Sequence, residues 1–374
     1  MDGIKIMNKK IKVLLFSLSE NIGGVETLLR NLYPHFDKEN MEFHFVTTYK
    51  HPVYKEELEQ AGAYIHKLPS QNLPFGYYCA LKKLIKKYNF DVIHVNKNSS
   101  ADITPFVLGH KYNIPVIIAH SHNTKSSVGK IADIVHMINR KKMDRYMTHA
   151  FASSEEAAEW MFSKKYCQTH SVPILKNGID ISQFTYNEFK RDEIRKRLSL
   201  SGKFVVGHIG QFIQRKNHQF LIDIFKEIHK IKPNSVLLLV GSGEEMATIQ
   251  QKAQKEGLFD SVMFMGSQNN INEYYQAMDA FVLPSFAENL PVVGIEAQAA
   301  GLPVFVSNTV DAELEITNNI KWLSLEQPAE IWANIIVNTC DCLVREDKSE
   351  ELKNAGYDIS ITAEVLEKIY KSAK

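Results

Sequence analysis

Short apolar runs alternate with longer amphipathic stretches along the whole chain, and this alternation limits the folds that the sequence can adopt. The runs are rich in Val, Ile, Leu and Phe, a pattern typical of buried parallel strands joined by helices. In the first half we predict strands at residues 11–16, 42–47, 63–67, 91–95, 115–119, 148–152 and 171–175. In the second half we predict them at residues 204–210, 235–240, 261–265, 279–284 and 303–306. The sequence therefore predicts an α/β fold.

A polar, charged segment separates the two groups of predicted strands. Residues 177–203, NGIDISQFTYNEFKRDEIRKRLSLSGK, show no strand pattern and predict an interdomain connection with a short helix. A chain of 374 residues also has the length of two ordinary domains. Open α/β sheets bind ligands at the carboxyl ends of their strands. We therefore expect two doubly wound domains that face each other across a cleft.

Composition narrows the class of protein. With 44 basic and 43 acidic side chains the formal charge is +1, so no global field favours nucleic acid and an anion must be met locally. The four cysteines are too few and too scattered for a disulfide framework, which predicts a reduced cytosolic protein with structural thiols. The first apolar run, IKVLLFSL, is too short for a signal peptide, and no run approaches the ~20 apolar residues of a membrane span. The cysteines are Cys79, Cys167, Cys340 and Cys342.

A glycine pair follows the first predicted strand, in SENIGGVETLLRNL. Gly23 and Gly24 would let the backbone approach an anion at a helix N-terminus, although a plain tight turn explains them equally well. The segment lacks the three-glycine dinucleotide fingerprint, and VTTYK after the second strand lacks the acidic residue that would bind a ribose. A nicotinamide-dependent enzyme is therefore disfavoured.

Two histidines follow the predicted strand VIIA, in HSHNT. His120 and His122 are two residues apart, so they share one face of an extended chain. As a metal pair they lack a third ligand at a telling spacing. They are either satisfied structural histidines or residues that orient a substrate hydroxyl.

Two cations lie at a later strand-to-helix junction, in VVGHIGQFIQRKNHQFLIDIF. Arg215 and Lys216 would suit a diphosphate there, because their charge and the helix dipole both favour an anion. The alternative is a solvated basic turn.

Two carboxylates stand out in the apolar segment SFAENLPVVGIEAQAAGLPVFVS. Pro291 and Gly301 predict a helix at about 291–300, which puts Glu288 in the preceding loop and Glu296 within the helix. Their backbones are then about 10 Å apart, roughly the span of a phosphate-bridged sugar. Salt-bridged or exposed glutamates are the alternative.

Together these motifs resemble a known family. The Glu-x7-Glu pair in ENLPVVGIE and the lysine of GQFIQRKNH resemble the retaining, GT-B-fold nucleotide-sugar glycosyltransferases. NIGGVE, HSHNT and KNGID are similar to the branch that builds bacterial capsular polysaccharides and exopolysaccharides. The resemblance implies an acceptor-side Rossmann-like domain at 1–180, on which a C-terminal helix at 357–374 packs back, and a donor-binding Rossmann-like domain at 181–356.

The resemblance also implies roles for individual residues. Glu296 would bind the nucleoside ribose, Glu288 would lie against the donor sugar near the reaction centre, and Lys216 would neutralise the phosphates. Either His120 or His122 would be the catalytic-site histidine, with a slight preference for His122. Family members often carry arginine where this chain has Gln211, so one cation that would contact the phosphates is absent. Arg215 would replace that cation only if its side chain points the same way. Further donor-binding positions would be Gly23, Gly24, Gly210, Gln211, Gly266, Ser267, Asn289 and Leu290.

The absence of an Asp-x-Asp triplet from the sequence predicts a metal-independent reaction without a cofactor. By resemblance the donor is a UDP-sugar and the acceptor a saccharide or a lipid-linked saccharide. Attack from the face that the nucleotide leaves and double displacement through Glu288 are both open. An epimerase or hydrolase of nucleotide sugars and a binding module without catalysis are the alternative classes.

Basic residues in two amphipathic helices bear on the acceptor side. ALKKLIKKYNF and MINRKKMDRYM suit an anionic membrane surface, although solvated lysine faces explain them equally well. If the membrane interpretation holds, the protein is cytoplasmic and peripheral on the inner face of the cell membrane. The basic residues are Lys82, Lys83, Lys86, Lys87, Arg140, Lys141, Lys142 and Arg145.

Overall fold

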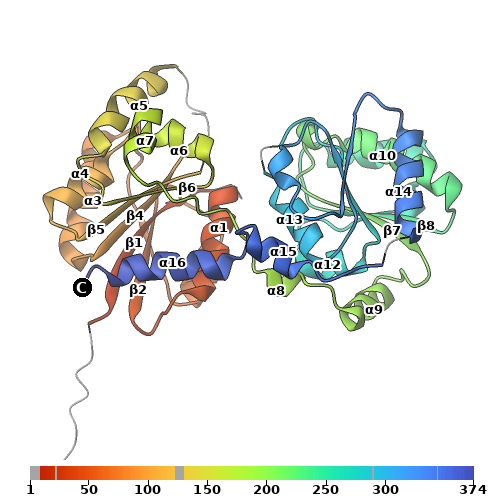
Figure 1. The fold of residues 1–374 in the computed structure, drawn as a ribbon, viewed down its shortest axis with the longest axis horizontal. Coiled ribbons are helices and arrows are strands. Elements are labelled where there is room, and N and C mark those ends of the chain that lie inside the picture. The colour runs from red at the N-terminus through yellow and green to blue at the C-terminus, as the bar shows by residue number, and fades with distance from the viewer. Residues whose placement is uncertain (1–8, 22, 123–129, 289, 343) are drawn as a thin grey trace, which may run out of the picture. The chain divides into compact units, whose positions relative to one another are not determined.

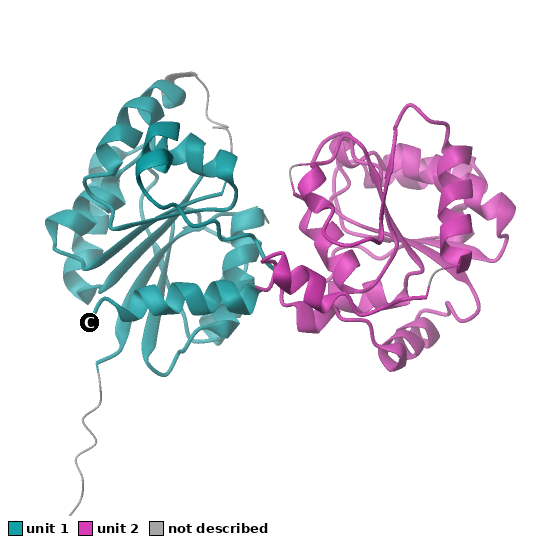
Figure 2. Cartoon of the chain, viewed as in Figure 1, with its two compact units in different colours: residues 1–178, 359–374 teal, residues 179–358 magenta. Residues whose placement is uncertain are grey.

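The chain forms two compact units, each with its own sheet (Figure 2). A computed structural model describes residues 9–21, 23–122, 130–288, 290–342 and 344–374. Unit 1 comprises residues 1–178 and 359–374, and unit 2 comprises residues 179–358.

The sheet of unit 1 has six parallel strands in the order β3-β2-β1-β4-β5-β6. Every residue of β5 is buried, because helices cover both faces of the sheet. The strands are β1 (Ile11–Leu18), β2 (Met41–Thr47), β3 (Tyr64–Lys67), β4 (Val92–Lys97), β5 (Val116–Ser121) and β6 (His149–Ala152). The helices are α1 (Gly24–Leu32), η1 (Tyr33–His35), α2 (Lys55–Gln60), α3 (Pro74–Tyr88), α4 (Thr104–Lys111), α5 (Lys130–Met143), α6 (Glu155–Phe162), α7 (Lys164–Thr169) and α16 (Ile359–Lys371).

The sheet of unit 2 also has six parallel strands, in the order β12-β11-β10-β7-β8-β9. The strands are β7 (Phe204–Ile209), β8 (Ser235–Val240), β9 (Val262–Phe264), β10 (Ala280–Leu283), β11 (Val304–Ser307) and β12 (Ile320–Leu323). The helices are α8 (Ile181–Phe184), α9 (Glu188–Arg197), η2 (Gln214–Lys216), α10 (His218–Ile231), α11 (Met246–Lys255), η3 (Phe259–Ser261), α12 (Ile271–Ala277), α13 (Val292–Ala299), η4 (Ala312–Leu314), α14 (Ala329–Cys342) and α15 (Ser349–Asn354).

Two Rossmann-like folds are therefore present, which confirms the predicted α/β class (Figure 1). Two strand predictions need correction. Residues 171–175 form only a single bridge, from Ile174 to Ala152, and the proline at 173 has no N–H for a ladder. The sequence pattern missed β12, a short edge strand that exposes Lys321.

The strand order reverses once in each sheet. In unit 1 the reversal lies between β1 and β4, and in unit 2 between β7 and β10. Connections leave such a point in opposite directions, so the loops after these strands are where a doubly wound sheet holds ligands.

The last helix belongs to the first unit. α16 packs against β1 and α1, and its buried Tyr370 hydroxyl lies 2.6 Å from Nδ1 of His94 on β4 (Figure 1). The core of unit 1 therefore needs both ends of the chain.

Two properties of the described residues concern the chain as a whole. No helix among them combines the length and the apolar character that crossing a bilayer requires. The four cysteines are free thiols.

Candidate active site

A buried ion pair joins the two loops at the strand reversal of unit 2. Lys216, at the end of η2 after β7, places Nζ 2.7 Å from Oε1 of Glu288, in the loop after β10. Arg215 reaches the other oxygen of the same carboxylate, with Nη1 2.8 Å from Oε2. The Glu288 backbone is fixed in turn, because it bridges to Val310 and its carbonyl accepts from the Asp311 N–H. The structure thus brings Glu288 to Arg215 and Lys216, which lie more than 70 positions earlier in the sequence.

Burial distinguishes the two cations. The side chains of Glu288 and Lys216 are 7% and 10% exposed, whereas that of Arg215 is 50% exposed. Burial lowers the pKa of Lys216 below its ordinary 10.5, and the Glu288 carboxylate opposes that shift. Arg215 points to the same carboxylate as Lys216. Gln211 itself is exposed.

The turns that follow β7, β8 and β9, next to this ion pair, pack backbone against backbone. Gly241, after β8, has φ +140°, and a Cβ there would lie 1.9 Å from the Gly210 carbonyl oxygen. Its N–H donates to the Gly266 carbonyl, and Gly266 has φ +65° after β9. The hydroxyls of Ser242 and Ser267 are 2.8 Å apart. Three successive strand ends therefore form one continuous rim beside Lys216.

Glu296 lies within α13 and is buried, with 4% exposure. The Tyr275 hydroxyl of α12 donates to its Oε2 at 2.8 Å. Burial raises the pKa of Tyr275 well above 10, and the nearby Glu296 carboxylate adds to that shift. Pro291 is the N-cap of the helix and Gly301 follows its C-cap with φ +66°, so the predicted helix is confirmed to within one residue at each end.

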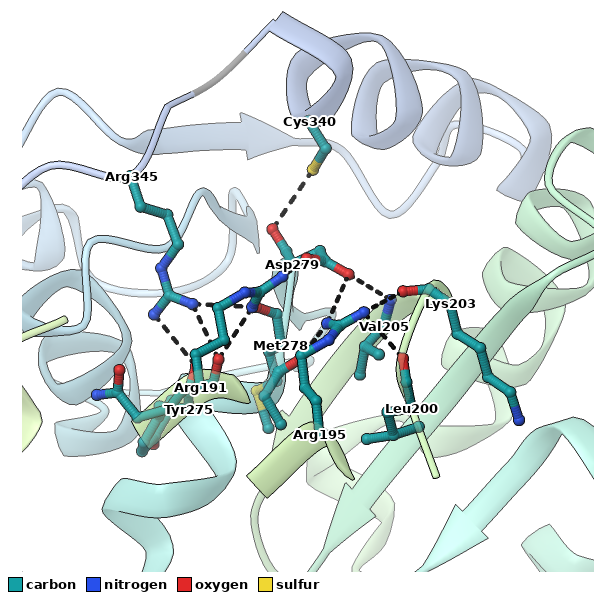
Figure 3. A network of polar contacts seen from close by, with 12 residues as sticks. Arg191, Arg195, Leu200, Lys203, Val205, Tyr275, Met278, Asp279, Cys340 and Arg345 are labelled. Carbon is teal, nitrogen blue, oxygen red and sulfur yellow. Dashed lines mark hydrogen bonds and ion pairs between the residues drawn. The ribbon is translucent and has the colours of Figure 1, made fainter. Parts of the chain in front are cut away.

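An arginine holds the C-terminal ends of the two helices that carry this pair (Figure 3). Arg345 donates to the carbonyls of Ala300, which caps α13, and of Tyr275 in α12. Burial lowers the pKa of Arg345 to about 9. Asp279, in the same network, pairs with Arg191 and accepts from the Val205 N–H at 2.7 Å. The network fixes α12 and α13 relative to each other, and with them the Tyr275–Glu296 hydrogen bond.

The two sequence-predicted histidines of unit 1 differ in their surroundings. His120, on β5, is 1% exposed, and its Nδ1 is 3.3 Å from Nε2 of His94. Burial, which is the largest cause, and the nearby His122 keep the pKa of His120 well below 6.5. His122 follows the strand, is only partly buried, and has its ring centroid 4.0 Å from that of His120. His120 is therefore a core residue behind His122.

Asn96, at the carboxyl end of β4, orients His122. Its Nδ2 donates to the Phe16 carbonyl at 3.3 Å, so its Oδ1 faces His122 Nε2 at 2.8 Å. Nε2 therefore carries the hydrogen. Burial lowers the pKa of His122 to about 4, with Asn177 partly opposing the shift, so the ring is neutral at pH 7. Nδ1 is then the acceptor of the ring.

For the other predicted positions the structure gives the location in the fold. Gly23 caps α1 and Gly24 is its first residue. Leu290 is partly buried, and Asn289 lies outside the described residues. Gly23, Gly24, His120 and His122 belong to unit 1, whereas the remaining predicted positions belong to unit 2.

Sequence reasoning missed several polar residues that support the site. The sequence did not indicate Asn96 and Tyr275, because the residue to which each one forms a hydrogen bond lies on another element. His208 and His218, beside Lys216, are almost fully buried and keep ring nitrogens without a hydrogen-bond partner among the described residues. Burial and the charge of Lys216 lower the pKa of His218 to about 4. The sequence did contain a signal for them: His208 lies at a strand end, in GHIGQ, and His218 lies at a helix start, in KNHQF.

No cluster of three or more His, Cys, Asp or Glu among the described residues is arranged to hold a metal ion. The chemistry that these residues offer is that of fixed cations, a buried carboxylate and a neutral imidazole.

Comparison with known proteins identifies the family. Residues 22–183 match the family described as Glycosyltransferase Family 4, and residues 190–335 match Glycosyl transferases group 1. The chain is 30% identical to the putative glycosyltransferase EpsF of Bacillus subtilis, over 97% of both proteins. The chain belongs to the GT-B glycosyltransferases. As a member of this family, it is an enzyme that transfers a sugar.

Other members of the family align over nearly the full length. CapH of Staphylococcus aureus, a capsular polysaccharide biosynthesis glycosyltransferase, is 27% identical over 97% of this chain and 99% of its own. An Escherichia coli UDP-Gal:α-D-GlcNAc-diphosphoundecaprenol α-1,3-galactosyltransferase is 23% identical over 98% of both. Among solved structures, Anabaena Alr3699/HepE in complex with UDP covers 97% of this chain and 98% of its own at 19% identity, with a TM-score of 0.71. The structural likeness shows that the GT-B fold is shared.

Proposed function

We propose that this glycosyltransferase transfers a sugar from a UDP-sugar to a saccharide or lipid-linked saccharide, with retention of anomeric configuration and without a metal ion. The reaction serves the synthesis of capsular polysaccharide or exopolysaccharide in the cytoplasm. The buried Lys216–Glu288 pair at the strand reversal of unit 2 carries this proposal. A fixed cation at that position suits the diphosphate of a nucleotide sugar, since strand reversals are where doubly wound sheets hold nucleotides.

Each part of the donor has a candidate contact. Lys216 and Arg215 would meet the diphosphate, so that charge on the leaving group is balanced without a metal. Glu296, held by Tyr275, would accept from the ribose hydroxyls. The rim at Gly266 and Ser267 would hold the base, and the backbone at Asn289 and Leu290 would contact the phosphate or the sugar.

The reaction is proposed to occur on one face of the sugar. The acceptor hydroxyl oxygen forms the new bond to the anomeric carbon as the bond to the UDP oxygen breaks. The acceptor proton passes to the departing phosphate. Glu288 would lie against the sugar and keep Lys216 in place, and the neutral His122 would accept from a substrate hydroxyl through Nδ1.

The names of the relatives favour this substrate class. The Escherichia coli relative is named for a UDP-galactose donor and a diphosphoundecaprenol-linked acceptor, and CapH for capsule synthesis. Their alignment over nearly the full chain is the ground for proposing the same classes here.

A donor panel tests the function. Purified protein is incubated with UDP-, GDP- and TDP-sugars, with and without membrane extract, in the presence and absence of EDTA. We expect release of UDP from one UDP-sugar only when extract is present, without loss in EDTA, and an axial anomeric product from an axial donor by NMR. Donor consumption without acceptor would instead indicate a hydrolase or epimerase, and binding without turnover a degenerate module.

Glu288→Gln tests the course of the reaction. The amide keeps the shape of the side chain but removes the charge that Lys216 neutralises. We expect a loss in kcat of about 100- to 1000-fold, with no covalent intermediate on the wild-type enzyme by mass spectrometry. A glycosyl group attached to Glu288 would overturn the same-face course in favour of double displacement.

A further inference from the structure

His208, the last residue but one of β7, is a buried histidine with a free acceptor. Its Nδ1 lies 2.8 Å from the carbonyl oxygen of Val282 on β10. A carbonyl only accepts hydrogen bonds, so Nδ1 carries the hydrogen and Nε2 is the acceptor of the ring. Nε2 is buried and has no hydrogen-bond partner in the part of the chain that the structure describes. Since buried polar atoms are nearly always paired, this acceptor suits a donor that reaches it only when a ligand is bound.

Neighbouring rings fix the orientation of the His208 imidazole. The ring of Phe281 lies parallel to it, with the two planes 6° apart and the centroids separated by 6.1 Å. The ring of His218 stands edge to face against it, with a centroid distance of 4.7 Å. His218 is itself stacked on Phe212 at 4.2 Å. Together with the hydrogen bond to Val282, these contacts keep Nε2 pointing in one direction.

The direction in which Nε2 points is toward Lys216. A Cβ on Gly210 would lie 3.1 Å from Nε2 of His208 and 3.5 Å from Cε of Lys216. The acceptor and the carbon that carries the ammonium therefore flank the same point, which a side chain at position 210 would fill. The ammonium has three N–H donors on a flexible stem, so a turn of the stem can direct one of them at Nε2.

The charge state of His208 suits this contact. Burial, which is the largest cause, and the nearby His218 and Lys216 keep the pKa of His208 well below 6.5, although the hydrogen bond to Val282 opposes the shift. The imidazole is therefore neutral at pH 7. A neutral acceptor can hold an ammonium without cancelling its charge, whereas an imidazolium would have no acceptor and would repel it.

We propose that His208 is a positioning residue for Lys216: when the diphosphate of the donor binds, Nε2 of His208 accepts from the ammonium and holds it against the phosphate. This inference rests on the proposed function, because it requires a diphosphate at Lys216. The two neighbours of the ammonium then have different roles. Glu288 neutralises it in the free enzyme, with Nζ 2.7 Å from Oε1. His208 orients it in the complex without adding a negative charge that would repel the phosphate.

Two substitutions separate the two nitrogens of the ring. In His208→Asn the amide N–H can replace Nδ1 as donor to Val282, but no atom replaces Nε2. In His208→Gln an amide oxygen reaches the position of Nε2, but the donor to Val282 is lost. We expect the Kd for UDP, measured by calorimetry at pH 7, to rise about tenfold in His208→Asn and to stay within about twofold of the wild type in His208→Gln. The reverse order would show that only the bond to Val282 matters and would overturn the proposal.

The matched control is His229→Asn, in the last turn of α10 in the same unit. His229 is partly buried, and its Nδ1 lies 3.0 Å from Oγ of Ser235. This variant should leave the Kd for UDP unchanged. Thermal unfolding of each variant without ligand shows whether the fold is kept. A wild-type Kd in a folded His208→Asn protein would contradict the proposal, as would an equal rise in Kd for both His208 variants, which would indicate a packing defect.

Nitrogen NMR of the wild-type protein with labelled histidines tests the contact without relying on the fold of a variant. On addition of UDP the Nε2 resonance of His208, identified by its absence from His208→Gln, should move upfield as Nε2 accepts a hydrogen bond, while Nδ1 stays in place. An Nε2 resonance that does not move at saturating UDP would refute the positioning role and leave the proposed function intact. Failure of the wild type to bind UDP at all would overturn both proposals.

Discussion

The two units share one strand order but treat their strand reversal in opposite ways. In unit 2 charged side chains lie at the reversal, where Lys216 and Arg215 both form ion pairs with the Glu288 carboxylate. In unit 1 the carboxyl ends of β4 and β5 carry the neutral Asn96 amide and His122 imidazole, and the cation there, Lys97, is paired with Asp102. The same backbone plan thus presents a cationic surface in one unit and a set of neutral donors and acceptors in the other.

Under the proposed function, the fold sets the place of each ligand, whereas a few side chains select its chemistry. The fixed cation of unit 2 suits an anion, and the neutral imidazole of unit 1 suits a hydroxyl. The following four predictions test that division, from the largest expected effect to the smallest.

Lys216→Ala removes the fixed cation and leaves the buried Glu288 carboxylate with Arg215 alone. We expect kcat to fall by about 100- to 1000-fold and the affinity for UDP to fall with it, measured by transfer assay and calorimetry. The matched control is Lys226→Ala, which breaks the more exposed Lys226–Glu256 pair of the same unit and should leave both values unchanged. Turnover near the wild-type rate in Lys216→Ala would refute the charged-site interpretation.

Acid should destabilise unit 1 more than unit 2. Burial lowers the pKa of His94 to about 3 and that of His122 to about 4, both below the ordinary 6.5. As the pH falls below 6.5, the unfolded chain therefore binds protons before the folded chain does. The contribution of these histidines to the free energy of unfolding is complete above pH 6.5 and is lost toward pH 4. The loss is up to about 1.4 kcal/mol per pH unit for each fully buried group. The described histidines with a lowered pKa are His44, His66, His94, His120, His122, His136 and His149 in unit 1, and His208 and His218 in unit 2.

Hydrogen exchange by mass spectrometry at pH 7 and pH 5, corrected for intrinsic rates, measures this difference. Strand peptides of unit 1 should lose more protection than those of unit 2. Equal loss in both units would show that the buried histidines do not control acid stability.

Tyr275→Phe removes the hydrogen bond to Glu296 without changing the shape of the core. We expect the free energy of unfolding to fall by about 1 kcal/mol and the Kd for UDP to rise about fivefold, because the carboxylate loses its orientation. Tyr274→Phe, on the same helix, is the control, since no hydrogen bond of its hydroxyl is present among the described residues. A weaker UDP complex in Tyr274→Phe than in Tyr275→Phe would count against this role of the Tyr275 hydroxyl.

Asn96→Ala removes the group that fixes the His122 tautomer. We expect the nitrogen chemical shifts of His122 to report a mixture of tautomers, and kcat/KM to fall about threefold to tenfold. Asn98→Ala, two residues along and exposed, is the control. Unchanged His122 shifts in Asn96→Ala would exclude the proposed positioning.

Much of the fold could be predicted because buried strands have a strong sequence pattern. β8, SVLLLV, is buried at every residue, and the pattern located it to the residue. β12 was missed because an edge strand exposes one side, so that Lys321 interrupts the apolar run. The predicted strand around Ile174 failed for a local reason, the proline beside it.

The candidate site could be predicted only in part. Sequence located Lys216, Glu288 and Glu296 at the right elements, because strand-to-helix junctions are readable from the chain. Their pairings were not readable, since contact between Lys216 and Glu288 depends on β7 and β10 being neighbours in the sheet. Asn96 and Tyr275 could not be predicted from the sequence for the same reason.

The return of α16 to unit 1 has a consequence for how the chain is made. Most of unit 1 is synthesised before unit 2, but unit 1 lacks Tyr370 and the rest of α16 until residues 359–371 have been made. Unit 2, whose residues 179–358 are contiguous, has all of its sequence earlier. The unit whose synthesis starts first is therefore completed last, and a nascent chain that ends before residue 359 can hold a complete unit 2 while β1 and α1 still lack the helix that packs on them.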